Sequence, residues 1–390
     1  GKWGLTIFMT RIMFPYLFFI TLAALASGIL NALGRFFVPA STPILFNVAV
    51  IIAVAGWAGG AGRPALVFAA GVAAGGVLQL ALQVPFLWKE GMRFAFNPTF
   101  RHPVVRRVGR LMVPGIFGAS VYQVNFALSR MFASGLEKGS ASALYYASRI
   151  EELSLGLFSI ALASALLPAF SEQAAARETG ELKRTLGFSL KLTSVVAFPA
   201  AAGLIALGRP IIRTLFERGQ FDAGSTARSA ACLLFFALGL PFVSGVKVVA
   251  PAFFSLKDTR TPVRIGLVVM AINTAASLIL MGPLRVGGLA LALSLSQVLN
   301  FVLLYAWLER KIGPMDRKSW AFAAAIHPEG LLLWPAAALE RAGFAIRAGA
   351  LAGAILAGIL IYAAVMAVLS PGDLKSAAGL VRRAAGKEKP

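Results

Sequence analysis

Long apolar segments alternate with short polar segments along the whole chain. Eleven apolar segments can be delimited, at about 10–32, 41–58, 64–88, 111–134, 142–169, 186–208, 229–250, 262–281, 287–308, 319–338 and 346–370. Most of them are long enough to cross about 30 Å of hydrocarbon as an α-helix that rises 1.5 Å per residue. They lack the period-two alternation of barrel strands. The pattern predicts an all-α polytopic membrane protein with about eleven transmembrane helices.

The composition agrees with a membrane protein. The chain is 58% hydrophobic and 14% charged, against about 45–50% and about 25% in soluble domains. Small residues recur within the apolar segments, as at Gly71 and Gly75, and let helices approach closely in lipid. This composition excludes a disordered protein, and the one cysteine excludes a disulfide scaffold or a cysteine-rich metal site.

The net charge of +21 is carried by short segments between the apolar ones. Alternate loops hold about 22 and about 9 Lys and Arg residues, and the positive-inside rule places the richer set in the cytoplasm. The C-terminus is then cytoplasmic, and the basic loops have anionic membrane phospholipids as neighbours. No nucleic-acid motif accompanies the charge, so nucleic acid is not an expected partner.

Signatures of enzymes and cofactors are missing from the sequence. His102 and His327 lie on different loops without Cys or carboxylate at metal-ligand spacing, and neither a P-loop nor a G-x-S-x-G motif occurs. We therefore expect no enzymatic activity, no cofactor and no direct use of ATP. The opening GKWGLTIFMT is not a signal peptide, and we expect the natural chain to begin before it.

The segment RPIIRTLFERGQFDAGSTAR, residues 209–228, mixes Ile, Leu and Phe with Arg and Glu. This mixture favours a helix that lies in the membrane interface. The alternative is an ordinary solvated loop.

Charged residues within one predicted span need a reason, because an intramembrane charge costs about 2.5–3.5 kcal/mol on insertion scales. Ser142, Tyr145, Arg149 and Glu152 recur at helical spacing and are expected on one face. The functional interpretation is a guanidinium that faces a central cavity and grips phosphate with its planar fork. The alternative is a structural Arg149–Glu152 ion pair, or side chains that snorkel to the interface. Glu151 is expected to point elsewhere, toward the interface.

Other polar residues inside the spans leave two interpretations open. Gln123 and Arg130 are seven residues apart on one helical face, and could line the same cavity or bond a neighbouring helix. Asn273 and Ser277 form an i,i+4 pair that could ligate a cation, although a hydrogen bond to a neighbouring helix is the favoured interpretation. Lys247, near a helix end, is expected to snorkel.

Four blocks of sequence resemble a known family. They are GRFFVPASTPILFNVAVI, GGVLQLALQVPFLWKEGM, ALYYASRIEELSLGLFSIALASALLPAFS and VKVVAPAFFSLKDTRTPVRI. Through these blocks the chain resembles the bacterial lipid II flippases of the MurJ/MviN type, within the multidrug/oligosaccharidyl-lipid/polysaccharide exporter superfamily. The tyrosine pair followed by Arg and Glu is the most specific block.

The resemblance implies a fold of fourteen transmembrane helices, with two six-helix lobes in a V and a final helix pair that adds a groove. This chain would begin at the fourth helix, and the three preceding helices would restore a cytoplasmic N-terminus. Residues 1–90 would then complete the N-lobe, 91–311 would form the C-lobe, 312–372 the extra pair, and 373–390 a basic cytoplasmic tail.

The resemblance also implies roles for individual residues. Arg149 corresponds to the family's arginine that holds the pyrophosphate of the substrate, with Ser142 and Glu152 as neighbouring functional positions. Some members bind Na⁺ in the C-lobe through acidic residues. The corresponding positions here are Ser129, Asn273 and Ser277. Because none of them is acidic, we expect neither a Na⁺ site of that kind nor another metal site.

By resemblance, the protein would be a monomeric flippase of the bacterial inner membrane. It would move lipid II, the undecaprenyl-pyrophosphate-linked disaccharide peptide, from the inner to the outer leaflet by alternating access, for peptidoglycan synthesis. Cationic residues would hold the pyrophosphate, while the polyprenyl tail stays in lipid along the groove of the last two helices. Two alternatives stay open: a flippase for another lipid-linked oligosaccharide, of O-antigen or capsule type, and a cation-coupled multidrug antiporter that uses Glu152.

Overall fold

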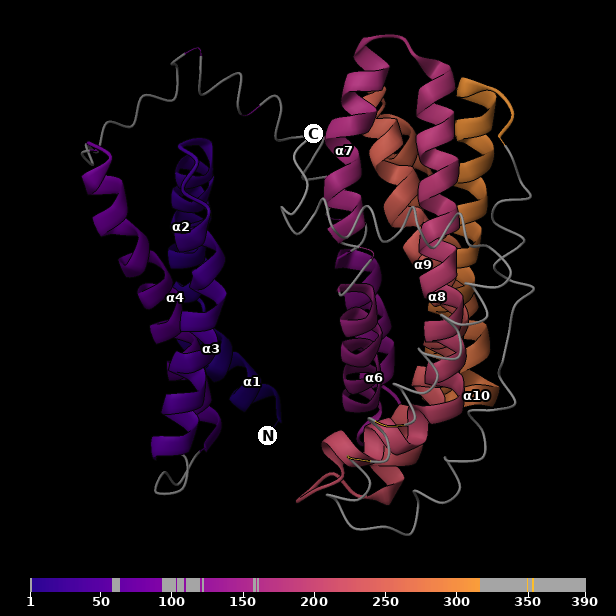
Figure 1. Ribbon diagram of the computed structural model, residues 1–390. Helices are drawn as coiled ribbons and strands as arrows, with labels where there is room; N and C mark the ends of the chain where they lie inside the picture. The colour runs from indigo at the N-terminus through magenta and orange to yellow at the C-terminus, as the bar shows by residue number, and fades with distance from the viewer. Residues whose placement is uncertain are drawn as a thin grey trace. The chain divides into compact units, whose positions relative to one another are not determined.

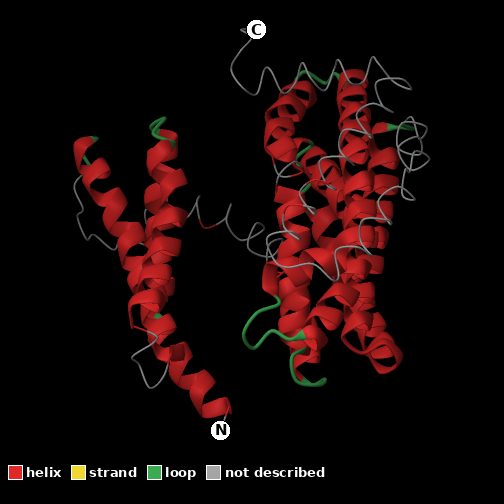
Figure 2. Ribbon diagram, turned by 60° about the horizontal axis from the view of Figure 1, so that its bottom comes forward, coloured by secondary structure: helices red, strands yellow, loops and turns green. Residues whose placement is uncertain are grey.

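The computed structural model describes residues 2–57, 64–92, 123–156, 159 and 161–315, together with the isolated positions 103, 109, 120, 349 and 353. Regular secondary structure in these ranges is helical throughout, as predicted (Figure 2). The predicted spans at 319–338 and 346–370 and the basic tail at 373–390 lie outside the described residues. The chain divides into two compact units, residues 1–100 and 101–390.

The first unit contains helices α1 Lys2–Met13, α2 Pro15–Ala32, α3 Phe37–Trp57 and α4 Pro64–Lys89 (Figure 1). Helix α2 begins with proline in its first turn, where the missing N–H removes no intrahelical hydrogen bond. Helix α4 packs against both α2 and α3.

Small residues bring α3 and α4 into close contact. A Cβ added to Gly75 would lie 2.6 Å from the ring of Phe46, and a Cβ added to Gly71 would lie 2.9 Å from Ala53. Any larger side chain at either glycine would therefore push the two helices apart. This confirms the close approach that the sequence predicts at these two positions.

The second unit is built around a buried central helix. Its helices are the stretch 123–134, α6 Ser140–Leu155, α7 Ala161–Ala175, α8 Thr179–Phe216, α9 Ala223–Ser255 and α10 Arg260–Ile312. Helix α9 contacts α6, α7, α8 and α10, so that it occupies the middle of the bundle (Figure 1). Its buried side chains, such as Leu233, Leu240 and Phe253, supply much of the apolar core.

Helix α10 folds back on itself. A straight helix of 53 residues would be about 80 Å long, far more than a membrane requires. The hydroxyl of Ser296 nevertheless donates to Asn273 Oδ1 at 3.2 Å, across 23 residues. The reversal lies at Arg285, where φ is 50° and ψ is −130°, and a Cβ on Gly288 would overlap the carbonyl of Leu280. The two arms are the apolar segments predicted at 262–281 and 287–308.

Six helical stretches within the described residues are long and apolar enough to cross a membrane. Large apolar side chains on these stretches are widely exposed, including Phe37 and Ile279. An apolar exterior of this kind is what a protein in lipid needs, whereas a soluble monomer would cover it.

The segment 209–228 is a corner between two helices and not a separate helix. Residues 209–216 form the last turns of α8, a turn follows at 217–222, and α9 begins at Ala223. Ile212 is fully buried in the core of the bundle, which ties this end of α8 to its neighbours. Asp222 caps α9 by accepting a 2.7 Å hydrogen bond from the backbone N–H of Ser225.

Candidate functional site

A polar face of helix α6 lies on the surface of the second unit. Ser142, Tyr145 and Arg149 are exposed and Glu152 is partly exposed, so the predicted common face is confirmed. Arg149 Nη1 lies 2.8 Å from Glu152 Oε2, and Arg149 Nη2 donates to Glu152 Oε1 at 3.1 Å. The guanidinium carbon of Arg149 lies 4.9 Å from the centre of the Tyr145 ring. The ion pair and the ring together hold the guanidinium in one orientation.

A second guanidinium approaches the same ring from the neighbouring helical stretch, 123–134. The guanidinium carbon of Arg130 lies 5.3 Å from the centre of the Tyr145 ring and 4.3 Å from that of Phe126. Its Nε is buried and has no hydrogen-bond partner among the described residues. Gln123 is exposed about two turns earlier on the same stretch. Two positively charged guanidiniums therefore lie beside the Tyr145 ring on one side of the unit.

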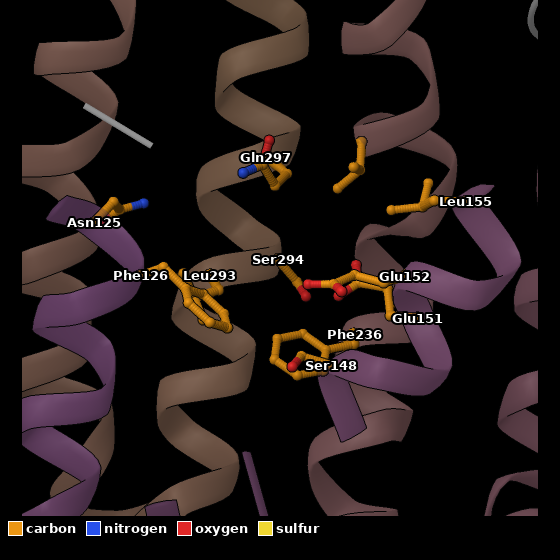
Figure 3. A pocket seen from close by; sticks show the side chains of 11 residues that line it. Asn125, Phe126, Ser148, Glu151, Glu152, Leu155, Phe236, Leu293, Ser294 and Gln297 are labelled. Carbon is orange, nitrogen blue, oxygen red and sulfur yellow. The ribbon is translucent and has the colours of Figure 1, made fainter. Parts of the chain in front are cut away.

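Behind this face lies a small pocket between α6, α9, α10 and the stretch 123–134, with a cavity volume of about 50 Å³. Its polar lining residues are Asn125, Ser148, Glu151, Glu152, Ser294 and Gln297. Figure 3 shows the carboxylates of Glu151 and Glu152 extending from α6 toward Ser294 of α10. A cavity of this volume holds a few water molecules but no sugar or peptide.

The expectation that Glu151 points to the interface is wrong. Glu151 follows Ser148 by three residues and precedes Leu155 by four, so all three occupy the side of α6 that lines the pocket. Lys247 of α9 acts electrostatically on Glu151 and is only partly exposed, so its charge is directed to the same region.

Of the three positions that correspond to a Na⁺ site, Ser129 and Asn273 belong to a buried hydrogen-bonded network, whereas the hydroxyl of Ser277 is buried without a hydrogen-bond partner among the described residues. Asn273 Nδ2 donates to Asn125 Oδ1 at 2.7 Å, which confirms the predicted bond to a neighbouring helix. Ser296 donates to Asn273, and Ser129 donates to the carbonyl of Asn125 at 3.1 Å. Within the described residues no group of three or more His, Cys, Asp or Glu side chains could hold a metal ion. The amide side chains of Asn125 and Asn273 therefore bond to each other and link the stretch 123–134 to α10.

Several polar residues of this region were not singled out from the sequence. Ser294, Ser296 and Gln297 occur in the apolar run LALALSLSQVLN, where a serine commonly bonds the carbonyl four residues earlier. Ser296 does donate to Ala292 at 2.7 Å, but it also reaches Asn273 on the other arm of α10. Ser294 donates to the carbonyl of Phe235 on α9 at 2.7 Å, so contacts with remote helices distinguish both serines from ordinary helix serines.

Comparison with known proteins gives one consistent result. A family model described as lipid II flippase MurJ matches residues 2–368. The probable lipid II flippase MurJ of Vibrio cholerae is 35% identical over 388 residues, which are 97% of this chain and 74% of the relative. The lipid II flippase MurJ of Burkholderia cenocepacia is 34% identical over 340 residues, covering 85% of this chain. The chain spans 66% of that relative, and 63% of the 34% identical protein of Haemophilus influenzae.

Solved structures show the same likeness. A lipid II flippase MurJ in an inward closed conformation superposes with a TM-score of 0.73 at 25% identity, over 92% of this chain and 73% of that one. An inward-facing multidrug transporter of the MATE family superposes with a TM-score of 0.68 at 14% identity, over 79% of this chain and 72% of that one. The second likeness concerns the fold alone, and both support the predicted all-helical exporter architecture.

Proposed function

The chain belongs to the lipid II flippase MurJ family, and from this membership we propose that it moves lipid II from the inner to the outer leaflet of the bacterial inner membrane. It is a multi-pass membrane transporter and not an enzyme. The transported molecule is a pyrophosphate-linked disaccharide peptide on a polyprenyl chain. Its headgroup is anionic and large, so the protein has to provide a polar route for it through the hydrocarbon.

The observation that supports this proposal is the pair of guanidiniums at Tyr145. Lipid contact would leave Arg149 and Glu152 in hydrocarbon at a cost of several kcal/mol, so this exposed face of α6 has to meet water or a polar ligand. An arginine has five N–H donors, and the ion pair with Glu152 occupies two of them. The remaining donors of Arg149 can bind a phosphate oxygen without breaking that pair.

Arg130 adds a second positive charge beside the same ring. Its guanidinium carbon lies 5.3 Å from the centre of that ring, so its charge attracts an anion at this face. Ser142 is exposed on the same face and can donate a further hydrogen bond. Two guanidiniums and a hydroxyl match the charge and the acceptor oxygens of a pyrophosphate.

The headgroup itself requires more room than the pocket behind α6 provides, because that pocket holds only a few water molecules. We assign the headgroup to the exposed face of α6, and we assign residues 1–90 to the N-lobe and 91–311 to the C-lobe of a transporter that works by alternating access. The polyprenyl tail would remain in lipid along residues 312–372, most of which lie outside the described residues.

The test is transport by Arg149 variants in a bacterium depleted of its own lipid II flippase. Arg149→Ala is expected to abolish growth and to leave lipid II in the inner leaflet, as measured by its accessibility to an external probe. Arg149→Lys keeps the charge but loses the planar fork, so its activity is expected to lie between those of the parent and Arg149→Ala.

A matched control is available on helix α8. Arg184 is also exposed and lies 3.8 Å from the carboxylate of Glu181 in an i,i+3 pair, but it has no aromatic ring beside it in any described contact. Arg184→Ala is expected to transport normally. Normal transport by Arg149→Ala would refute the role of this site. Normal lipid II distribution together with restored export of another glycan would indicate a different lipid-linked oligosaccharide as substrate.

A further inference from the structure

Glu151 is the charged group of this region that the proposed phosphate site does not use. Its carboxylate lines the small pocket together with that of Glu152 (Figure 3). The neighbouring carboxylate, Glu152, is paired with Arg149 at 2.8 Å. Two adjacent glutamates therefore have different surroundings, and only one of them has a paired guanidinium.

The groups around Glu151 come from every element that lines the pocket. Helix α6 contributes Ser148 and Glu152, the stretch 123–134 contributes Asn125, and α10 contributes Ser294 and Gln297. Lys247 of α9 acts on Glu151 electrostatically, yet no ion pair within 4.0 Å joins the two in the described part of the chain. The groups that line the pocket with Glu151 are thus uncharged, apart from Glu152, which carries the same sign.

A carboxylate in such a place is costly while it is ionised. Glu151 is only partly exposed, so its unpaired charge loses part of its hydration, and the neighbouring carboxylate adds repulsion. Taking up a proton from water forms an O–H bond on the carboxylate and removes both penalties. Hydroxyl and amide neighbours can bond either form, because they both donate and accept. The pocket is large enough for the few water molecules that would carry the proton.

We infer that Glu151 is a proton-binding site whose occupancy is coupled to anion binding at the exposed face of α6. With Glu151 ionised, the five charged groups Arg130, Arg149, Lys247, Glu151 and Glu152 have a net charge of about +1, and protonation raises it to about +2. A proton and an anion would then favour each other's binding, and this linkage is reciprocal. The proton site depends only on the pocket, whereas its coupling to transport rests on the proposed function.

Infrared spectroscopy of the purified protein in nanodiscs tests the proton site without any substrate. The parent is expected to show a carboxylic acid C=O band that is lost as the pH is raised and the group ionises. Glu151→Gln is nearly isosteric and is expected to lack this band. Glu181→Gln, which removes an exposed carboxylate of α8, is expected to retain it. An unchanged band in Glu151→Gln would overturn the assignment.

The ligand and the coupling are then tested separately. If the band responded to Na⁺ at constant pH but not to pH, the site would bind a metal cation and not a proton. That result would overturn the proposal. For coupling, pyrophosphate binding to the parent is expected to tighten as the pH falls, and this dependence should disappear in Glu151→Gln. A pH-independent parent would overturn the coupling. A titrating Glu151 in a protein that moves no lipid II would leave the proton site standing and refute the proposed function.

Discussion

The buried amide network between the stretch 123–134 and α10 permits a quantitative test. Asn273 is 1% exposed, donates to Asn125 at 2.7 Å and accepts from Ser296 at 3.2 Å. The substitution Asn273→Ala removes both bonds. Ser296 keeps a partner, because it also donates to the carbonyl of Ala292. Asn125 Oδ1, in contrast, loses the donor described here and stays buried.

The expected loss of stability follows from these contacts. Each interhelical hydrogen bond in a membrane protein is worth about 0.6 kcal/mol on average, so the two bonds together contribute about 1 kcal/mol. Leaving the Asn125 carbonyl oxygen buried without a donor adds about 1–3 kcal/mol. The single variant should therefore unfold at a free energy about 2–4 kcal/mol lower than that of the parent. In the double variant Asn125→Ala/Asn273→Ala no orphaned acceptor remains, so its loss should fall below the sum of the two single losses.

The assay is reversible unfolding of the purified protein in mixed micelles, followed by circular dichroism over a denaturing-detergent titration. The four members of the double-mutant cycle are compared at one pH and one detergent composition. Additive losses in the double variant would refute the direct pairing of the two amides. The same measurement in NaCl and in choline chloride should give equal stabilities, because no Na⁺ site is expected in this network. A Na⁺ site occupied at 100 times its Kd would instead raise the stability in NaCl by about 2.7 kcal/mol.

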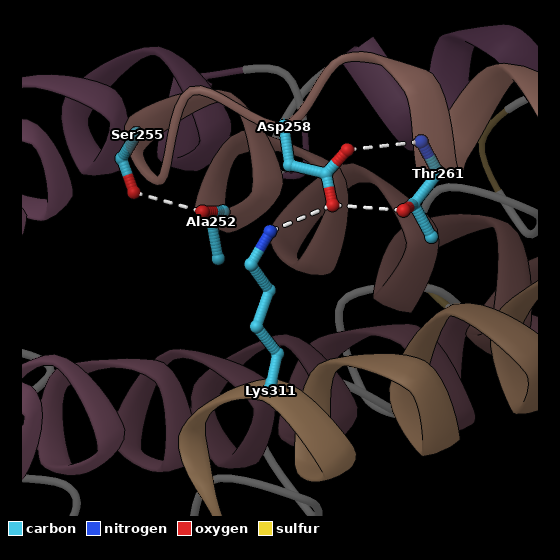
Figure 4. Close-up of polar contacts among 5 residues, drawn as sticks. All are labelled: Ala252, Ser255, Asp258, Thr261 and Lys311. Atoms are coloured by element: carbon cyan, nitrogen blue, oxygen red, sulfur yellow. Dashed lines mark hydrogen bonds and ion pairs between the residues drawn. The ribbon is translucent and has the colours of Figure 1, made fainter.

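Two further predictions concern the ends and the turn of α10. Gly288→Ala places a Cβ against the carbonyl of Leu280, so the hairpin must open, and we expect the melting temperature to fall, with Gly282→Ala as a control because nothing lies near that position. At the loop before α10, Asp258 accepts from Lys311 Nζ at 2.7 Å and from the backbone and hydroxyl of Thr261 (Figure 4). Burial alone would raise the pKa of Asp258, but these hydrogen bonds outweigh it and lower the pKa to about 2. Its contribution to stability should therefore be complete above about pH 4 and lost as the pH falls through about 2, and acid unfolding of Asp258→Asn should lack this step.

Much of the fold follows from hydropathy because lipid makes strict demands on the chain. Apolar runs of helical length have to satisfy their backbone internally, and this alone gives an all-helical bundle. The fold-back of α10 can also be predicted from the sequence, since the run Gly282-Pro283-Leu284-Arg285 separates two apolar segments. The residue at which α8 ends is harder to predict from the sequence. Pro210 suggests an interruption, yet the helix continues through it because Ile212 packs in the core.

Periodicity located one face of α6 and misplaced the other. Ser142, Tyr145, Arg149 and Glu152 share a face because helical spacing is a property of the local chain. Whether the remaining side of α6 meets lipid, water or other helices depends on α9 and α10, which are remote in sequence. Glu151 was therefore expected at the interface, and only the packing of those helices places it in a pocket.

Helix α6 thus carries ionisable groups on two sides, and neither side can face hydrocarbon without cost. On one side Arg149 and Glu152 form a pair that is less than half exposed, and on the other Glu151 lines a small pocket that Glu152 also borders. Because Glu151 and Glu152 are adjacent, a change of charge in the pocket acts on the carboxylate that orients Arg149. A proton in the pocket and an anion on the surface therefore influence each other through two adjacent residues of a single helix. A pathway through more distant residues is not needed to couple them.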